Sequence, residues 1–364
     1  LGAQFTRLGI LIPWIPAAAI SIFLVMKNSS SERTGLSSAR IAPSPYDITL
    51  IILIALQVGY NFFRALIRPI EAYDAVSIYG LKAKIIYFAG GMGNDFFRHV
   101  AADFHGAHAD YPLFVPLSQA WVYTFLGRFN DLLVKAIFPL FYLSALFIIY
   151  AVLKRVTQKR TISLMFTFML ASIKQFADYS TIGVADLALG IFFSISIFYI
   201  YLWFRAKENT HFLGISLFSS VLCVCTKNEG TLLALISLSL FFLYLVAESR
   251  NNGKREIFQF LGYAGIICSV IVFWALFKKH SGLVNENFNL SMLGFGSLRA
   301  SLYKLQVIAY EYQKQIFGFK KWNIVWVIFL CLLFIGRKKV FSGNIKYLTA
   351  AFFLFLSGYT AVYV

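Results

Sequence analysis

Long apolar runs with few charges recur along the whole chain of 364 residues and constrain its fold more than any other feature. Inside a lipid bilayer every backbone N–H and C=O group needs an internal partner, so only helices and closed barrels cross it. Barrel strands are short segments of alternating polarity, and that pattern is absent from the sequence. Charged residues make up 13% of the chain, about half the share typical of a soluble domain. We therefore predict an all-α, polytopic membrane protein.

The apolar runs predict about ten membrane spans or more, because a crossing helix needs roughly 20 apolar residues. Residues 112–127 are also apolar but contain Pro112, Pro116 and Gln119, so we predict a helix at the membrane interface there. The chain begins at Leu1 without Met and ends inside an apolar run, so we expect a single transmembrane domain that belongs to a longer protein. The predicted spans are 8–26, 46–67, 131–153, 161–177, 184–204, 211–226, 230–247, 257–277, 322–336 and 346–364.

Basic residues cluster in alternate loops, as the positive-inside rule expects of loops on the cytoplasmic side. This distribution accounts for much of the net charge of +17 without nucleic-acid binding. The opposite, outer side receives residues 68–130, 178–183, 227–229 and 278–321. The loops assigned to the cytoplasm contain Lys27, Arg33, Arg40, Lys154, Arg155, Lys159, Arg160, Arg205, Lys207, Arg250, Lys254, Arg255, Arg337, Lys338, Lys339 and Lys346.

The first outer loop opens with two carboxylates, Glu71 and Asp74, directly after a predicted span. Acidic residues at a membrane surface are costly, so we interpret the loop that this pair opens as one wall of an active site on the outer side. The pattern that follows predicts an amphipathic interfacial helix from Asp74 to Phe88. Lys82 and Lys84 lie off its apolar stripe of Ile78, Leu81, Ile85 and Phe88. They are either substrate-binding groups or lysines that reach the membrane surface.

The same loop continues with Arg98, His105, His108, Asp110 and Tyr111. A separation of three residues would place His105 and His108 on one helical face, where two imidazoles bind a metal ion. No HExxH motif accompanies them, so the alternative is that they form hydrogen bonds or contact a phosphate. We interpret Arg98, His108, Asp110 and Tyr111 as substrate-binding residues.

Two short outer turns add further charged candidates. Asp186 begins a predicted span, where it would either cap its helix or point into a polar cavity shared with Asp74. Lys227 and Glu229 flank a tight reversal between two apolar runs. They would pair with each other, or Lys227 would contact a lipid phosphate. In the last outer loop, residues 278–321, basic residues alternate with tyrosines, which suits an anionic lipid or a solvated interfacial loop.

These motifs together resemble those of bacterial membrane glycosyltransferases of the GT-C superfamily. The similarity is to the family 39-like group, which contains the protein O-mannosyltransferases and the aminoarabinose transferases, and it covers roughly residues 46–280. The acidic pair differs from the family pattern, because two residues separate Glu71 from Asp74. The motifs are Glu71-Ala-Tyr-Asp74, Lys82-Ala-Lys84, His108-Ala-Asp-Tyr-Pro112, Ala185-Asp186 and Lys227-Asn-Glu-Gly230.

The resemblance implies transfer of a sugar from a polyprenyl-phosphate donor to an acceptor hydroxyl on the periplasmic face of the bacterial inner membrane. It implies that Asp74 is the catalytic acidic residue, with Glu71 as a second carboxylate, and that basic residues bind the lipid phosphate. A divalent metal ion is a further candidate for stabilising the phosphate. The acceptor would be a lipid, a glycan or a protein. The alternatives are a flippase or transporter of lipid-linked sugars, and an oligosaccharide ligase or polymerase.

Overall fold

The structure is a computed structural model that describes residues 42–93, 95–104, 106–248, 253–283 and 298–363. These residues form sixteen α-helices, a π-helical segment and a 3-10 segment. Five helical segments are long and apolar enough to cross a membrane, and four shorter apolar helices accompany them. The chain is therefore an all-α, multi-pass membrane protein. The predicted span 8–26 lies outside the described residues.

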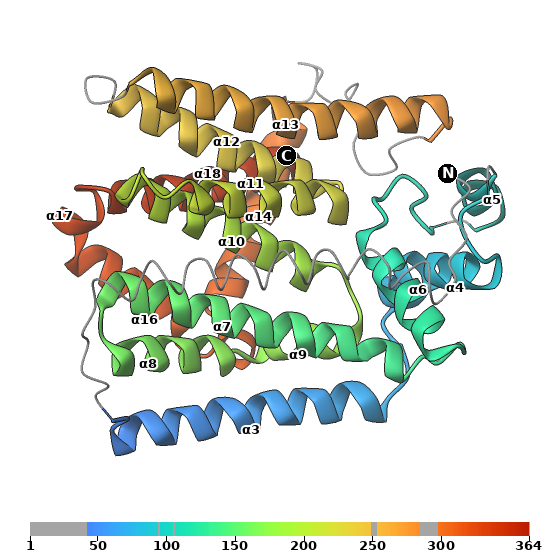
Figure 1. Cartoon of the computed structure of the whole chain (residues 1–364), viewed down its shortest axis with the longest axis horizontal. Coiled ribbons are helices and arrows are strands. Elements are labelled where there is room, and N and C mark those ends of the chain that lie inside the picture. The colour runs from blue at the N-terminus through green and yellow to red at the C-terminus, as the bar shows by residue number, and fades with distance from the viewer. Residues whose placement is uncertain (1–41, 94, 105, 249–252, 284–297, 364) are drawn as a thin grey trace.

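Figure 1 shows the order of the helices along the chain. Their bounds are α3 Pro45–Ile67, η1 Ala75–Gly80, α4 Leu81–Phe88, α5 Phe96–Asp103, α6 Phe114–Leu126, η2 Leu133–Ala136, α7 Ile137–Thr157, α8 Arg160–Ala171, α9 Lys174–Ile182, α10 Asp186–Arg205, α11 Thr210–Thr226, α12 Glu229–Ala247, α13 Lys254–His280, α14 Leu298–Ile316, α15 Phe319–Trp322, α16 Val325–Ile335, α17 Arg337–Val340 and α18 Ile345–Tyr363.

The long helices run side by side with α10 at the centre and α3 and α13 at the edges (Figure 1). Helix α10 contacts α7, α9, α11, α12 and α18, whereas α3 contacts only α7, α8, α9 and η2 among the pairs with extensive packing. Apolar residues cover nearly all sides of α10, as expected for a helix surrounded by other helices. Most of α3 faces outward, where lipid would satisfy its apolar side chains.

A buried group of hydroxyls joins the four helices α10 to α13. Ser196 Oγ lies 2.7 Å from Ser220 Oγ and 2.9 Å from Ser237 Oγ. Tyr263 Oη lies 2.9 Å from Ser220 Oγ and 3.0 Å from Ser216 Oγ. Inside apolar surroundings each of these hydroxyls needs a hydrogen-bond partner, and here they supply one another. The group therefore fixes how the four helices pack.

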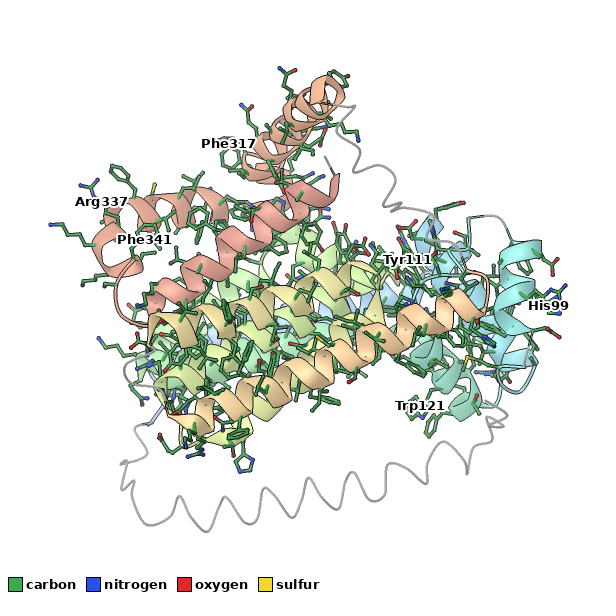
Figure 2. The ribbon with its side chains drawn as sticks, turned by 90° about the horizontal axis from the view of Figure 1, so that it is seen from above. His99, Tyr111, Trp121, Phe317, Arg337 and Phe341 are labelled. Carbon is green, nitrogen blue, oxygen red and sulfur yellow. The ribbon has the colours of Figure 1, made fainter. Side chains whose placement is uncertain are left out.

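The connections between the long helices gather at two opposite ends of the bundle. Helices α4, α5 and α6 lie at one end, together with the start of α10 and the turn between α11 and α12 (Figure 1). Helix α17 and the α7–α8 connection lie at the other end. Figure 2 shows the same separation, with Arg337 and Phe341 far from His99, Tyr111 and Trp121. This agrees with the prediction that the basic loops lie on one side and the loops that carry the candidate site residues lie on the other.

Two predicted spans differ from the structure. The span 161–177 is broken at Ser172 and Ile173, which separate α8 from α9. Tyr142 Oη donates to the carbonyl of Ala171 at 2.7 Å, and Asn323 Nδ2 donates to that of Ser172 at 2.8 Å. These distant side chains satisfy the carbonyls that the break leaves without a helical partner. The span 322–336 is also shorter than predicted, because α16 covers only eleven residues.

The described parts of the predicted outer loops contain several helices. A helix is present over most of 112–127 as α6, with Gln119 completely buried, and its predicted position at the membrane interface stays a prediction. The predicted helix from Asp74 to Phe88 is present as η1 followed by α4. Part of the last predicted outer loop, 278–321, forms α14 and α15.

Candidate functional site

The turn between α11 and α12 holds a lysine between two carboxylates. Lys227 Nζ lies 3.2 Å from Asp186 Oδ1, at the start of α10, and 3.2 Å from Glu229 Oε1, at the start of α12. Gly230 allows this turn to be tight, because a Cβ atom there would lie 1.7 Å from the carbonyl oxygen of Cys223. Asp186 is the first residue of α10 rather than its cap, and its carboxylate forms an ion pair instead.

The charges in this turn act strongly on one another. Burial alone would lower the pKa of Lys227, but the carboxylates of Asp186 and Glu229 outweigh it and raise that pKa above its ordinary value. Lys227 therefore stays protonated at any physiological pH. Burial raises the pKa of the phenol of Tyr79, on η1, and the charges of Lys227, Asp186 and Glu229 also act on it. The phenol is accordingly neutral.

The loop before α6 meets this turn. Asn228 Nδ2 donates to Asp110 Oδ2 at 2.5 Å and so connects the two segments. The ring of His108 stacks on that of Tyr111 at 4.7 Å, with His108 in a left-handed backbone conformation at φ 46°. Lys82 Nζ donates to the carbonyl oxygen of His108. We call the following residues the outer polar cluster: Tyr79, Lys82, His108, Asp110, Tyr111, Asp186, Lys227, Asn228 and Glu229.

Lys82 lies off the predicted apolar stripe, but the buried face of its helix is not that stripe. Its side chain is completely buried, whereas Phe88, which was predicted to lie on the apolar face, is 66% exposed. The carbonyl of His108 provides the hydrogen bond that a buried ammonium group requires. Helix α4 therefore packs by a face that includes Lys82, Ala83 and Ile86.

Four other predicted site residues lie outside the cluster. Asp74 and Glu71 are exposed, and neither carboxylate forms a hydrogen bond or ion pair with the described residues. Lys84 is exposed, with its ammonium group 5.1 Å from the centre of the Phe129 ring. Arg98 is exposed on α5. The roles predicted for these four residues remain predictions.

The predicted metal pair does not have the expected helical geometry. His105 lies outside the described residues, and His108 lies in the connection between α5 and α6, where its left-handed conformation is incompatible with a helix. Within the described ranges, no three His, Cys, Asp or Glu side chains gather closely enough to hold a metal ion.

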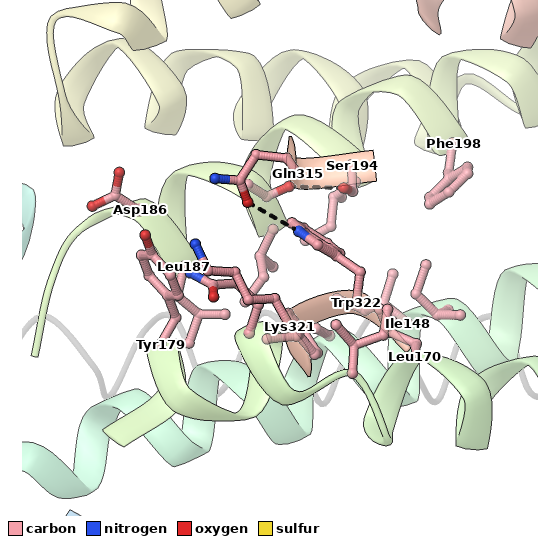
Figure 3. A pocket seen from close by; sticks show the side chains of 18 residues that line it. Ile148, Leu170, Tyr179, Asp186, Leu187, Ser194, Phe198, Gln315, Lys321 and Trp322 are labelled. Atoms are coloured by element: carbon pink, nitrogen blue, oxygen red, sulfur yellow. Dashed lines mark hydrogen bonds between the residues drawn. The ribbon is translucent and has the colours of Figure 1, made fainter. Parts of the chain in front are cut away.

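An apolar cavity of about 700 Å³ opens beside the outer polar cluster. Helices α7, α9 and α10 form its walls, and Gln315, Lys321 and Trp322 close one side (Figure 3). Trp322 Nε1 donates to Gln315 Oε1 at 3.4 Å, which connects α15 to α14. Asp186 lies at the rim, so one carboxylate belongs both to the cavity and to the cluster. The apolar lining residues include Ile148, Leu170, Leu187, Ile191, Ile195 and Phe198.

A second cavity, of about 640 Å³, lies on the other face of α9. We call it the basic cavity, because four cationic and two acidic side chains line it together with apolar residues of α3. Glu71 is one of the two acids, so the structure places this predicted catalytic residue away from the apolar cavity. The charged lining residues are Arg64, Arg68, Lys135, Lys174, Glu71 and Asp178.

Comparison of the chain with protein-family models, with curated proteins and with solved structures found no match. The sequence interpretation missed Tyr79 and Asn228, which complete the cluster. The sequence did contain a signal for Asn228, because it lies between Lys227 and Glu229 in one tight turn. A polar residue between two candidate site residues is expected to belong to the same site. Tyr79 gave no such signal in an apolar helical pattern.

Proposed function

We propose that the protein is a membrane-embedded glycosyltransferase that transfers a sugar from a polyprenyl-phosphate donor to an acceptor hydroxyl. The reaction would take place on the outer face of a bacterial inner membrane. The observation that carries the proposal is the position of Asp186, whose carboxylate lies at the rim of the apolar cavity and 3.2 Å from Lys227. A chain of isoprene units and a charged sugar-phosphate group need such a junction of apolar and polar surfaces.

The apolar cavity suits the lipid part of that donor. Its volume of about 700 Å³ lies within the range of small-molecule binding sites, about 300–1,000 Å³. Most of its wall is formed by α7, α9 and α10 of the bundle, so a lipid would reach it from the membrane, whereas Gln315 and Lys321 of the predicted outer loop 278–321 close one side. The sugar and the phosphate would then lie at the outer polar cluster, where Lys227 offers positive charge to the phosphate.

The chemistry requires a proton acceptor and a stabilised leaving group. The acceptor oxygen forms a bond to the anomeric carbon of the sugar while the bond between that carbon and the phosphate oxygen breaks. A carboxylate takes the hydroxyl proton as general base, and the polyprenyl phosphate leaves as an anion. Lys227 would stabilise the charge that develops on the phosphate.

Two carboxylates compete for the role of base. The geometry favours Asp186, because 41% of its side chain is exposed and it lies at the cavity rim. The resemblance to GT-C enzymes favours Asp74, which is exposed at the start of η1, the segment that carries Tyr79 into the cluster.

Transfer of labelled sugar from a synthetic polyprenyl-phosphate donor, in membranes that contain the protein, tests the proposal. We expect Asp186→Asn to abolish transfer and donor cleavage while the protein is still produced and folded. Asp74→Asn is measured in parallel and decides between the two bases. Asp95→Asn, which changes an exposed acid of the same outer region, is the matched control and should transfer normally.

The same assay separates the enzyme from a flippase. A transporter would move the labelled lipid across the membrane and leave the bond between sugar and phosphate intact. Movement of the donor without any cleavage, in the wild-type protein supplied with cell-envelope acceptors, would contradict the glycosyltransferase proposal. Full transfer by both carboxylate variants would show that neither acid acts as the base.

A further inference from the structure

The basic cavity contains more positive charge than its carboxylates can balance. Four cationic side chains and two acidic ones line it. Arg64 Nη1 lies 2.8 Å from Asp178 Oδ1, and Lys174 pairs with the same carboxylate, so one acid serves two cations. Arg68 forms no hydrogen bond or ion pair with the described residues, although its charge acts on the buried Lys135. This concentration of unbalanced charge calls for an anion.

Helix ends explain only two of the four cations. Cations at the C-terminus of a helix interact favourably with its dipole, which accounts for Arg64 and Arg68 at the end of α3. Lys135 and Lys174 come from η2 and from the beginning of α9, where the dipole gives no such benefit. Lys135 is 97% buried, and its ammonium group donates to the carbonyls of Pro69 at 3.0 Å and Thr181 at 3.2 Å. The fold thus retains a buried cation in the wall of the cavity.

The cavity is also open to lipid on one side. Tyr60, Phe63 and Ile67 line it, and each is more than half exposed on the outward face of α3. Helix α3 lies at the edge of the bundle (Figure 1), so a lipid beside it could place its head group among the cations. Arginine is well suited to a phosphate, because its planar guanidinium donates two parallel hydrogen bonds.

We propose that the basic cavity binds a phosphate group, and that Arg68 is the principal ligand. The site is separate from the apolar cavity, because α9 presents Phe176 and Tyr179 to one cavity and Lys174 and Asp178 to the other. Two sources have this chemistry, the phosphodiester of an anionic lipid in the outer leaflet and a free phosphate. The inference does not rest on the proposed sugar transfer.

Two substitutions that change the net charge of the basic cavity in opposite directions test this site. Arg68→Gln removes a cation and should weaken phosphate binding, whereas Glu71→Gln removes a repelling carboxylate and should strengthen it. Two unit charges about 5 Å apart in water interact by about 0.8 kcal/mol, so each affinity should change by about four-fold or more. Arg128→Gln is the control, because Arg128 is an exposed arginine that does not line the cavity.

Binding is measured on delipidated full-length protein in a neutral detergent, by native mass spectrometry with phosphatidylglycerol or phosphatidylcholine and by calorimetry with inorganic phosphate. Preferential, Arg68-dependent binding of phosphatidylglycerol identifies the lipid as the source. Arg68-dependent binding of inorganic phosphate without any lipid preference identifies free phosphate. Equal binding by wild type, Arg68→Gln and Glu71→Gln in both arms would overturn the proposal, whether or not sugar transfer is observed.

Discussion

Replacement of Lys227 by Met would remove the charge that separates two carboxylates and retain most of the side chain's length. Lys227 Nζ lies 3.2 Å from an oxygen of Asp186 and 3.2 Å from one of Glu229, so these oxygens are at most twice that, about 6.4 Å, apart. At an effective dielectric constant of about 20, their repulsion is about 2.6 kcal/mol or more. Because 41% of the Asp186 side chain is exposed, screening reduces the penalty to about 1–2 kcal/mol.

The pH dependence of this penalty follows from the pKa of Lys227. Burial lowers that pKa, but the two carboxylates outweigh burial and raise it in the folded protein above its value in the unfolded chain. The contribution of Lys227 to stability is therefore fully present below about pH 10 and is lost only as the pH rises further. Lys227→Met should accordingly unfold at a lower temperature than wild type at pH 8.

Thermal unfolding in detergent at pH 8 is the assay. The double variant Lys227→Met/Glu229→Gln should regain much of the lost stability at pH 8, because only one carboxylate then remains charged. Lys338→Met, which removes an exposed lysine on α17, is the control and should unfold like wild type. Wild-type stability of Lys227→Met at pH 8, or a further loss on adding Glu229→Gln, would refute the reasoning.

Three other changes have defined outcomes. Ser196→Ala removes a hydroxyl that forms hydrogen bonds with α11, α12 and α13, and it should lower the free energy of unfolding by about 1–3 kcal/mol. Ser194→Ala, on the same helix, is the control and should change that free energy little, as measured by chemical denaturation. Gly230→Ala places a methyl group 1.7 Å from the Cys223 carbonyl and should yield little monodisperse protein by size-exclusion chromatography. Burial acts to raise the pKa of Asp178, but Lys174 and Arg64 outweigh burial and hold it below its ordinary value. The ionised carboxylate therefore contributes to stability above about pH 4, and this contribution is lost as the pH falls further. Asp178→Asn should lose that pH dependence of unfolding.

The apolar runs were sufficient to predict the main helices. The predicted spans 46–67 and 230–247 differ by only a residue or two from α3 and α12, since hydrocarbon-facing helices show uniform hydropathy bounded by polar residues. The break between α8 and α9 was not predictable, because the Asn323 side chain that satisfies the Ser172 carbonyl lies 151 residues further along the chain. Nothing near residue 172 in the sequence carries that information.

The candidate site was predictable in part, because the apolar runs also show which charged residues lie at the ends of the spans. Charged residues at the ends of apolar runs on one side of the membrane had to lie near one another, which brought Asp110, Asp186 and Lys227 to one end of the bundle. Sequence periodicity could not show that Lys82 is buried, because its partner is a backbone carbonyl 26 residues away. Nor could it reveal the apolar cavity, whose walls come from helices distant in sequence.

The central claim is that the apolar cavity holds the lipid of a polyprenyl-phosphate sugar, and native mass spectrometry of the purified protein tests it most directly. Gly190 lines this cavity, and a Cβ atom there would meet nothing within 4 Å, so Gly190→Leu should partly fill the space without disturbing the fold. Gly214→Leu is the matched control, since that glycine is equally open but lies outside the cavity. We predict a bound polyprenyl-phosphate sugar in wild type and Gly214→Leu but not in Gly190→Leu. Retention of ordinary phospholipid alone, even after loading with polyprenyl-phosphate sugars, would contradict the account.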